Sequence, residues 1–195
     1  MLSHVARLKR AGLVALIVVG LHSYAFARSS TAITVGQVHD YVLANHFKLS
    51  GPGPYLTYAK PEADIFIKVY ARADKFTSGS ATMDAVLDAT ELVRQMDFTT
   101  TLCNGNEWWG KGRLDVEPAL IPRLNEMKEL LQNEVSSAAK SLFNVELSEA
   151  EISSIRAGKK IEASSISVTY AESLAKCDTN GGRSIYYKIL VKSRS

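Results

Sequence analysis

The sequence has few of the residues on which catalytic and metal sites are usually built. Its 195 residues include two cysteines, four histidines and two tryptophans. It contains no C-x-x-C pair, no G-x-S-x-G nucleophile motif and no G-x-x-x-x-G-K-[ST] phosphate loop. These absences argue against a cysteine metal site, a hydrolase with a nucleophile elbow and a P-loop nucleotide-binding protein.

The sequence also lacks an uninterrupted apolar run of membrane-spanning length. A spanning helix needs about 20 predominantly apolar residues, whereas the run at residues 11–21 ends at a histidine and a serine. Three cations precede this run, and an A-x-A-like site at residues 25–27 follows it. This order is typical of a cleaved secretory signal peptide. We therefore predict a signal peptide at residues 1–27 and a single exported domain, periplasmic or secreted, at residues 28–195. A retained membrane anchor is the alternative.

The predicted mature chain has no excess of positive charge. The whole chain contains 23 lysines and arginines and 20 aspartates and glutamates. Because three cations and no acids lie in residues 1–27, 20 of each sign remain after cleavage and the formal net charge is zero. A nucleic-acid-binding protein needs a clustered basic surface. We therefore expect no nucleic-acid partner, and no stable membrane insertion after cleavage.

Both cysteines, Cys103 and Cys177, lie in the predicted exported domain. In an oxidising compartment a lone pair of cysteines usually forms a disulfide. We predict this bond, which would close a loop of about 75 residues. Two free thiols or a metal pair are the alternative, but His39 and His46, the histidines left after cleavage, lie far away in the sequence.

The spacing of apolar residues predicts an α+β fold. Apolar residues three and four apart predict four helices. The first covers residues 35–47 with Thr34 as N-cap, and the second covers residues 82–96. The third runs from Pro118 to Leu142 with a break near residues 136–139, and the fourth covers residues 148–158 and begins with a capping box. Alternation predicts strands at residues 63–73 and 97–103, and a C-terminal hairpin of residues 163–173 and 183–193 with Asn180-Gly181 at its turn. We predict a single domain in which three to four helices pack on a small, mainly antiparallel sheet built on the C-terminal hairpin.

The stretch CNGNEWWGKGR, residues 103–113, is the first candidate binding loop. Trp108 and Trp109 lie in it, followed by Lys111 and Arg113. Tryptophan and arginine are enriched at binding hot spots because they combine a large contact area with a polar group. The alternative is that one indole fills the core and the other packs beneath the disulfide.

A second candidate surface is GPGPYLTYAKP, residues 51–61. Tyr55 and Tyr58 lie among prolines there and are predicted to offer an aromatic ledge to a sugar or a peptide. The plainer interpretation is a loop whose tyrosines pack on the core.

Candidates for nucleophilic catalysis are weak. His39 and His46 are seven residues apart, a spacing that does not converge on one metal ion as helical pairs three or four apart do. S-x-x-K occurs at residues 137–140 and 173–176, but the S-D-N and K-T-G elements that accompany a serine–lysine site are missing. We expect no metal and no cofactor.

These patterns favour a non-enzymatic function. We predict an exported protein-binding module that inhibits or neutralises a partner protein, or serves an envelope complex. The alternative is a domain that binds or hydrolyses cell-wall glycan, with Glu107 and Asp115 beside the tryptophans as its two carboxyl groups. A purely structural envelope subunit is the third possibility.

Overall fold

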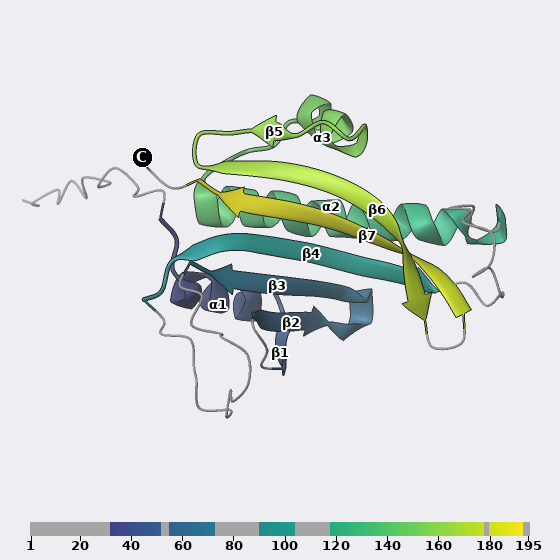
Figure 1. Ribbon diagram of the computed structural model, residues 1–195, viewed down its shortest axis with the longest axis horizontal. Helices are drawn as coiled ribbons and strands as arrows, with labels where there is room; N and C mark the ends of the chain where they lie inside the picture. The colour runs from purple at the N-terminus through teal and green to yellow at the C-terminus, as the bar shows by residue number, and fades with distance from the viewer. Residues whose placement is uncertain (1–31, 52–54, 73–89, 104–117, 178–179, 193–195) are drawn as a thin grey trace, which may run out of the picture.

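The computed structural model describes residues 32–51, 55–72, 90–103, 118–177 and 180–192 (Figure 1). Seven strands form one antiparallel sheet in the order β1-β2-β3-β4-β7-β6-β5. The strands are β1 (Lys48–Gly51), β2 (Leu56–Lys60), β3 (Ile65–Ala71), β4 (Val93–Cys103), β5 (Ile161–Glu162), β6 (Ile166–Cys177) and β7 (Asn180–Val191). The helices are α1 (Val35–Ala44), α2 (Ile121–Phe143) and α3 (Glu149–Arg156), with short 3-10 turns η1 (Pro61–Ala63) and η2 (Pro118–Leu120).

The sheet is much larger than the sequence predicted. The prediction of a small sheet built on the C-terminal hairpin is wrong, because β6 and β7 are only two of its seven strands. β1 and β2 have four and five residues, too few to show a clear alternation in the sequence. Pairing with β3 and with each other holds these two strands in place, so their formation depends on tertiary contacts.

The helix predicted at residues 82–96 is wrong at its C-terminal end, where the structure has a strand. A β-bulge explains the error. Residues 90–96 belong to the approach to β4 and to β4 itself, while residues 82–89 lie outside the described residues. The register between β3 and β4 shifts near Val93, which inserts Arg94 as an extra residue. Val93 and Met96 therefore both face the core although they are three residues apart. Apolar residues three apart are also typical of one face of a helix, so the sequence pattern predicted a helix here.

The N-termini of α1 and α3 are capped as the sequence predicted. Thr34 accepts a hydrogen bond at Oγ1 from the Gln37 backbone N–H at 3.3 Å, and the Gln37 side chain accepts one from the Thr34 N–H at 2.9 Å. Ser148 and Glu151 form the same reciprocal capping box at α3. Each box satisfies N–H groups that a helix start leaves without partners.

The long helix α2 is continuous, so the predicted break near residues 136–139 is wrong. The residues there are small because α1 packs against this part of α2. Tyr41 of α1 donates a hydrogen bond to Ser137 Oγ at 3.0 Å, and Ala138 and Ala139 are fully buried. Small side chains in this segment therefore reflect close helix packing.

The hairpin turn also differs from the prediction. Asn180 and Gly181 are the first residues of β7 and pair with Cys177 and Lys176. The connection between the strands consists of residues 178–179, which lie outside the described residues.

In the part of the chain that the structure describes, α1 and α2 lie on one face of the sheet and no helix lies on the other face. In Figure 1, α1 and α2 lie behind the sheet. The buried side of α2 comprises Leu124, Met127, Leu131, Val135, Ala138, Ala139 and Phe143. Alternate residues of β3, Ile65, Ile67 and Val69, are buried beneath the helices, so the residues between them lie on the opposite face. Among the described residues, no helix is long and apolar enough to cross a membrane.

Candidate functional site

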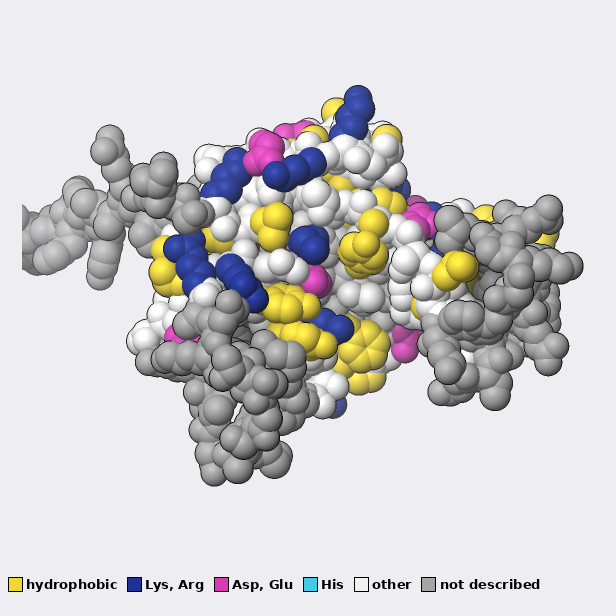
Figure 2. All heavy atoms as spheres, viewed as in Figure 1, with side chains coloured by type: hydrophobic (Ala, Val, Ile, Leu, Met, Phe, Trp, Pro, Cys, Tyr) yellow, Lys and Arg dark blue, Asp and Glu magenta, His cyan; other side chains and the backbone are white. Residues whose placement is uncertain are grey.

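The face of the sheet opposite α1 and α2, called the open face below, has three neighbouring rows of side chains across its central strands. Charged residues form the middle row, and aromatic or apolar residues occur in the row on either side. From β3 through β4 to β7, the rows are Tyr70–Gln95–Leu190, Lys68–Asp97–Lys188 and Phe66–Thr99–Tyr186. Figure 2 shows hydrophobic and positively charged side chains together on this face.

Tyr55 extends the aromatic part of the open face toward β2. Its ring lies 4.9 Å from that of Tyr70, measured between centroids, and Lys68 Nζ lies 4.8 Å from the Tyr55 centroid. These distances are typical of aromatic and cation–π contacts. The long Lys68 side chain is therefore held against an aromatic ring with its charge on the open face.

Tyr58, the other tyrosine of the predicted ledge, lies on the helix side of the sheet. Its side chain is 0% exposed, and its hydroxyl is 2.9 Å from His39 Nδ1. Burial raises the pKa of Tyr58 to about 12. Tyr55 and Tyr58 thus do not form one ledge, and Tyr70 is the ring that lies beside Tyr55.

Asp97 is the acid in the central row of the open face. Gln95 Nε2 donates a hydrogen bond to Asp97 Oδ1 at 2.8 Å. Burial, followed by the charge of Asp97 and a hydrogen bond to it, raises the pKa of Tyr70 to about 12. Tyr70 therefore remains a neutral phenol at physiological pH, and Asp97 is flanked by Lys68 and Lys188. The central row carries one more positive than negative charge.

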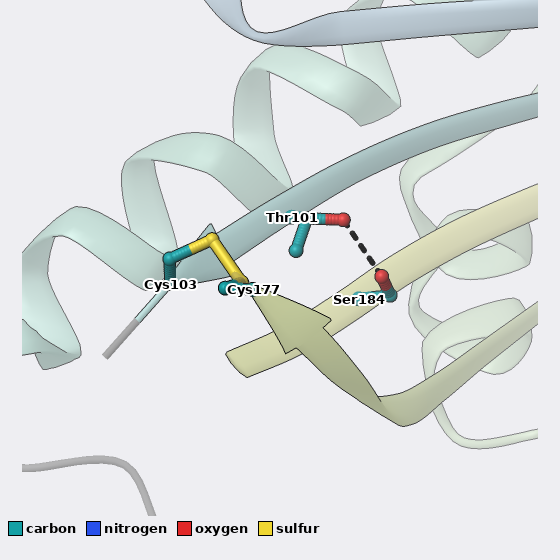
Figure 3. Close-up of a disulfide and its surroundings, with 4 residues drawn as sticks. All are labelled: Thr101, Cys103, Cys177 and Ser184. Carbon is teal, nitrogen blue, oxygen red and sulfur yellow. Dashed lines mark hydrogen bonds between the residues drawn. A yellow bond between two sulfur atoms is a disulfide. The ribbon is translucent and has the colours of Figure 1, made fainter. Parts of the chain in front are cut away.

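The predicted Cys103–Cys177 disulfide is present at one end of the open face (Figure 3). It joins β4 to β6 across the intervening strand β7. Strands two apart in a flat sheet are separated by about 9.5 Å, yet the two Cα atoms are 5.7 Å apart. The end of β6 passes in front of β7 in Figure 1, which brings the cysteines together. Thr101 of β4 and Ser184 of the intervening strand β7 share a hydroxyl hydrogen bond of 2.7 Å nearby.

Gly182 of β7 lies directly beneath this disulfide. A Cβ atom at Gly182 would lie 2.6 Å from Cys177 Sγ and 2.7 Å from the Leu102 carbonyl oxygen. Both distances are far below van der Waals contact, and the carbonyl belongs to the β4 backbone. Only glycine fits at this position without a shift of the strand or the disulfide.

Gly182→Ala is therefore expected to lower the free energy of unfolding by about 1 to 2 kcal/mol, as overpacking does. Urea unfolding of the oxidised protein measures the change. Gly158→Ala is not a suitable control because Gly158 has φ +83°; Ser141→Ala, an exposed site on α2, is suitable. An unchanged urea midpoint for Gly182→Ala would contradict the close approach of β7 to the disulfide and to the β4 backbone.

A hollow of about 370 Å³ lies between β3, β4 and the start of α2. Phe66, Leu102 and Met127 supply its apolar lining, with Asp64 and Arg123 as its charged residues. Arg123 is 4.0 Å from Asp64 Oδ2. Because Phe66 also belongs to the open face and is 41% exposed, an apolar side chain bound on that face could reach the hollow.

Glu172, on the helix side of β6, is the centre of a half-buried ionic network. Its carboxylate lies 2.7 Å from Lys128 Nζ and 2.7 Å from Arg183 Nε, and it accepts a hydrogen bond from the Tyr170 hydroxyl. Burial alone would raise the pKa of Glu172, but these partners outweigh it and hold the pKa below its ordinary value. The network joins β6, β7 and α2, and its full set of partners indicates a stabilising role.

The residues considered for catalysis have other partners. His39 contacts Tyr58, and His46 lies beyond the end of α1 with φ +66°, so the two histidines do not share a helix face. Ser137 accepts its hydrogen bond from Tyr41, while Lys140 pairs with Glu146 at 2.9 Å. Within the described ranges, no cluster of three or more His, Cys, Asp or Glu side chains could hold a metal ion.

Several predicted residues cannot be compared with the structure. The predicted signal peptide and the residues Glu107, Trp108, Trp109, Lys111, Arg113 and Asp115 lie outside the described residues. Their predicted roles stay predictions.

The open face itself was not recognised in the sequence, although a signal was present. Phe66 and Tyr70 alternate with buried residues of β3, and Tyr186 does so in β7. On a sheet with one solvated face, the outward positions are usually polar. Aromatic residues at these positions therefore indicate a binding surface once the helix-covered face is known.

The spacing of residues in the sequence could not show which face of the sheet the helices cover. It also could not show that β3, β4 and β7 are adjacent, because their adjacency depends on the strand order. Comparison of the chain with protein-family models, with curated proteins and with solved structures finds no match.

Proposed function

We propose that this protein is an exported, non-enzymatic binding module that captures another protein on the open face of its sheet. The observation that carries the proposal is the lysine–aspartate–lysine row between two rows that contain aromatic residues. Tyrosine is among the residues enriched at protein interfaces and hot spots. The disulfide supports export, since such bonds persist in oxidising compartments, and so does the N-terminal pattern of cations, apolar run and small residues.

The chemistry of the open face favours a partner with carboxylates among apolar side chains. Lys68 and Lys188 offer positive charge on both sides of Asp97, and the adjacent rings of Tyr70 and Tyr186 supply contact area. Cations next to aromatic rings give an interface both electrostatic orientation and buried surface. The hollow beside Phe66 has room for one apolar anchor of the partner.

The scaffold behind the open face is suited to rigid binding. The strands that carry the three rows are the central strands of the sheet, and α2 packs against β4 and β7 on the opposite side. The backbone of paired, supported strands is already ordered and loses little conformational entropy on binding, which favours affinity. We therefore expect the partner to bind with little change in the backbone of the central strands.

Tyr186→Ala is expected to weaken partner binding by roughly 30-fold, because truncation of a central aromatic hot spot costs about 2 kcal/mol. The partner is first identified by photo-crosslinking from a benzoylphenylalanine placed at position 186 of the exported protein, and its affinity for the purified variants is then measured by calorimetry. Leu130→Ala, at an exposed site on α2, is the matched control and should bind normally. Equal crosslinking from positions 130 and 186, or full affinity of Tyr186→Ala, would contradict the proposal.

A glycan is the alternative ligand, and one local arrangement favours it. The rings of Tyr55 and Tyr70 lie beside the hydrogen-bonding groups of Gln95 and Asp97, a combination that can stack on a sugar and bind its hydroxyls. Binding of soluble cell-wall fragments by the wild-type protein and its loss in Tyr70→Ala would favour this alternative. If the protein captures a partner protein and cell-wall fragments do not compete with this capture, the glycan alternative is excluded.

A further inference from the structure

The outer edge of β6 is largely without a partner strand among the described residues. β6 has twelve residues, whereas β5 pairs only with Ser167 and Val168. Figure 1 shows β5 and α3 beside the start and middle of β6, and no described strand alongside its second half. A strand edge of this kind is a template for another strand.

The direction of the backbone groups along β6 follows from two hydrogen bonds near its start. The Ile166 carbonyl accepts from the Ala163 N–H on the β5 side, and the Ser165 carbonyl accepts from the Lys192 N–H on the β7 side, both at 2.9 Å. In an antiparallel strand, residues alternate between the two sides. The register between β6 and β7 is uninterrupted from Ile166 to Cys177, so the alternation continues along the whole strand.

The N–H and C=O groups of Tyr170, Glu172 and Leu174 therefore point away from β7, toward the free edge. No described residue makes a backbone hydrogen bond to them on that side. Natural edge strands usually avoid pairing through proline, a bulge, a very short length or a charged side chain that points inward. The segment from Tyr170 to Lys176 has no proline and no bulge, and its inward charge, Glu172, is paired with Lys128 and Arg183 within the chain. Among the described residues, nothing therefore blocks the pairing of this edge with a further strand.

We propose that this edge binds a second copy of the chain, with the two β6 strands paired antiparallel about a two-fold axis at Ser173. Two identical strands can pair in this way because a two-fold interface brings the same surface of both subunits together. The pairing would join the two sheets into one continuous sheet, with both open faces on the same side. This inference is independent of the proposed partner binding.

The side chains of β6 are self-complementary in this register. On the open-face side, Ser173 lies opposite Ser173 of the second copy and Ala171 opposite its Ala175, so every pair is small and the backbones can approach. On the helix side, Leu174 lies opposite Glu172 of the second copy. Leu174 is 52% exposed in the single chain, and the pairing would cover it.

The charge of Glu172 does not oppose this arrangement. Its carboxylate is already neutralised by Lys128 and Arg183 within its own chain. A register centred on Glu172 would place two carboxylates opposite each other, which is unfavourable. The register centred on Ser173 avoids that repulsion and pairs more residues than one centred on Leu174, nearer the hairpin end.

The test is the oligomeric state of the full exported protein and of charge variants at position 173, measured by sedimentation equilibrium. Ser173 is exposed in the single chain, so Ser173→Lys leaves the fold intact, as circular dichroism would verify. In the dimer it places two lysines opposite each other, and we expect dimerisation to weaken roughly tenfold or more. Ser173→Glu should have the same effect, and Ser141→Lys on α2 is the control with the same charge change.

An equimolar mixture of Ser173→Lys and Ser173→Glu should restore the dimer, because opposite charges then face each other. Hydrogen exchange gives a second readout: the N–H of Leu174 should be protected in the wild-type dimer and exchange rapidly in Ser173→Lys. A monomeric wild-type protein at high concentration would overturn the proposal. So would a dimer that Ser173→Lys leaves unchanged, or a mixture of the two charge variants that stays monomeric.

Discussion

Removing the disulfide by C103A/C177A is expected to lower the free energy of unfolding by about 4 kcal/mol. The two cysteines are 74 residues apart in the sequence, and a cross-link that closes a loop of this length restricts the unfolded chain strongly. In the folded protein the bond also holds the end of β6 against β4 across β7. Urea unfolding of the oxidised wild type and the variant measures the loss.

Thr101→Ala is the matched control for the cysteine variant. It removes the neighbouring cross-strand hydrogen bond to Ser184 and leaves the disulfide intact, so a loss of about 1 kcal/mol is expected. If C103A/C177A lost no more than Thr101→Ala, strand pairing alone would hold the end of the hairpin, and the disulfide would contribute little.

Gly182→Ala in the cysteine-free background provides a further check on the close contacts at Gly182. Without Cys177 Sγ, one of the two close contacts of the added Cβ atom disappears, while the contact with the Leu102 carbonyl remains. The cost of Gly182→Ala should therefore be smaller than in the oxidised protein. A double-mutant cycle measures this coupling directly.

Glu172→Gln is expected to lower the free energy of unfolding by about 3 kcal/mol at neutral pH. The change removes the carboxylate charge that Lys128, Arg183 and the Tyr170 hydroxyl share, and it leaves two half-buried cations facing a neutral amide. Loss of one member of a buried ionic group costs about 3 to 5 kcal/mol. The lower end applies here because the network is partly solvated.

The effect of Glu172→Gln should also depend on pH. The folded-state pKa of Glu172 lies below its ordinary value of 4.5, so its stabilisation is fully present above pH 4.5. It is lost as the pH falls from that value through the lower folded-state pKa. The wild type and Glu172→Gln should therefore differ most at pH 7 and converge in acid. Urea midpoints at pH 7, 5 and 3 measure this.

Glu146→Gln is the control for the pH series, since Glu146 is exposed and its partner Lys140 is exposed as well. Exposed ion pairs contribute little to stability, so the midpoint of this variant should stay close to that of the wild type at each pH. A constant difference between wild type and Glu172→Gln from pH 7 to pH 3 would show that the carboxylate charge is not responsible.

Local features of the fold were predictable from the sequence because they depend on neighbouring residues. The capping residues Thr34 and Ser148 act on N–H groups within the same helical turn. β3 alternates without interruption, and its prediction at residues 63–73 is confirmed by the strand at Ile65–Ala71. The bulge at Arg94 shows the limit of prediction from local patterns. One inserted residue in β4 gave the buried residues of a strand the spacing that is typical of a helix.

The sequence by itself determined the disulfide pair, the helix caps, the long α2 helix and the strands of the C-terminal hairpin. Each depends on a count of two cysteines, on a short capping motif or on a periodic pattern within one segment. The tertiary structure alone decided the strand order, the pairing of β1 and β2, and which face of the sheet the helices cover. Those features arise from contacts between distant segments. The candidate site belongs to this second group: Lys68, Asp97 and Lys188 form one row only because β3, β4 and β7 lie side by side.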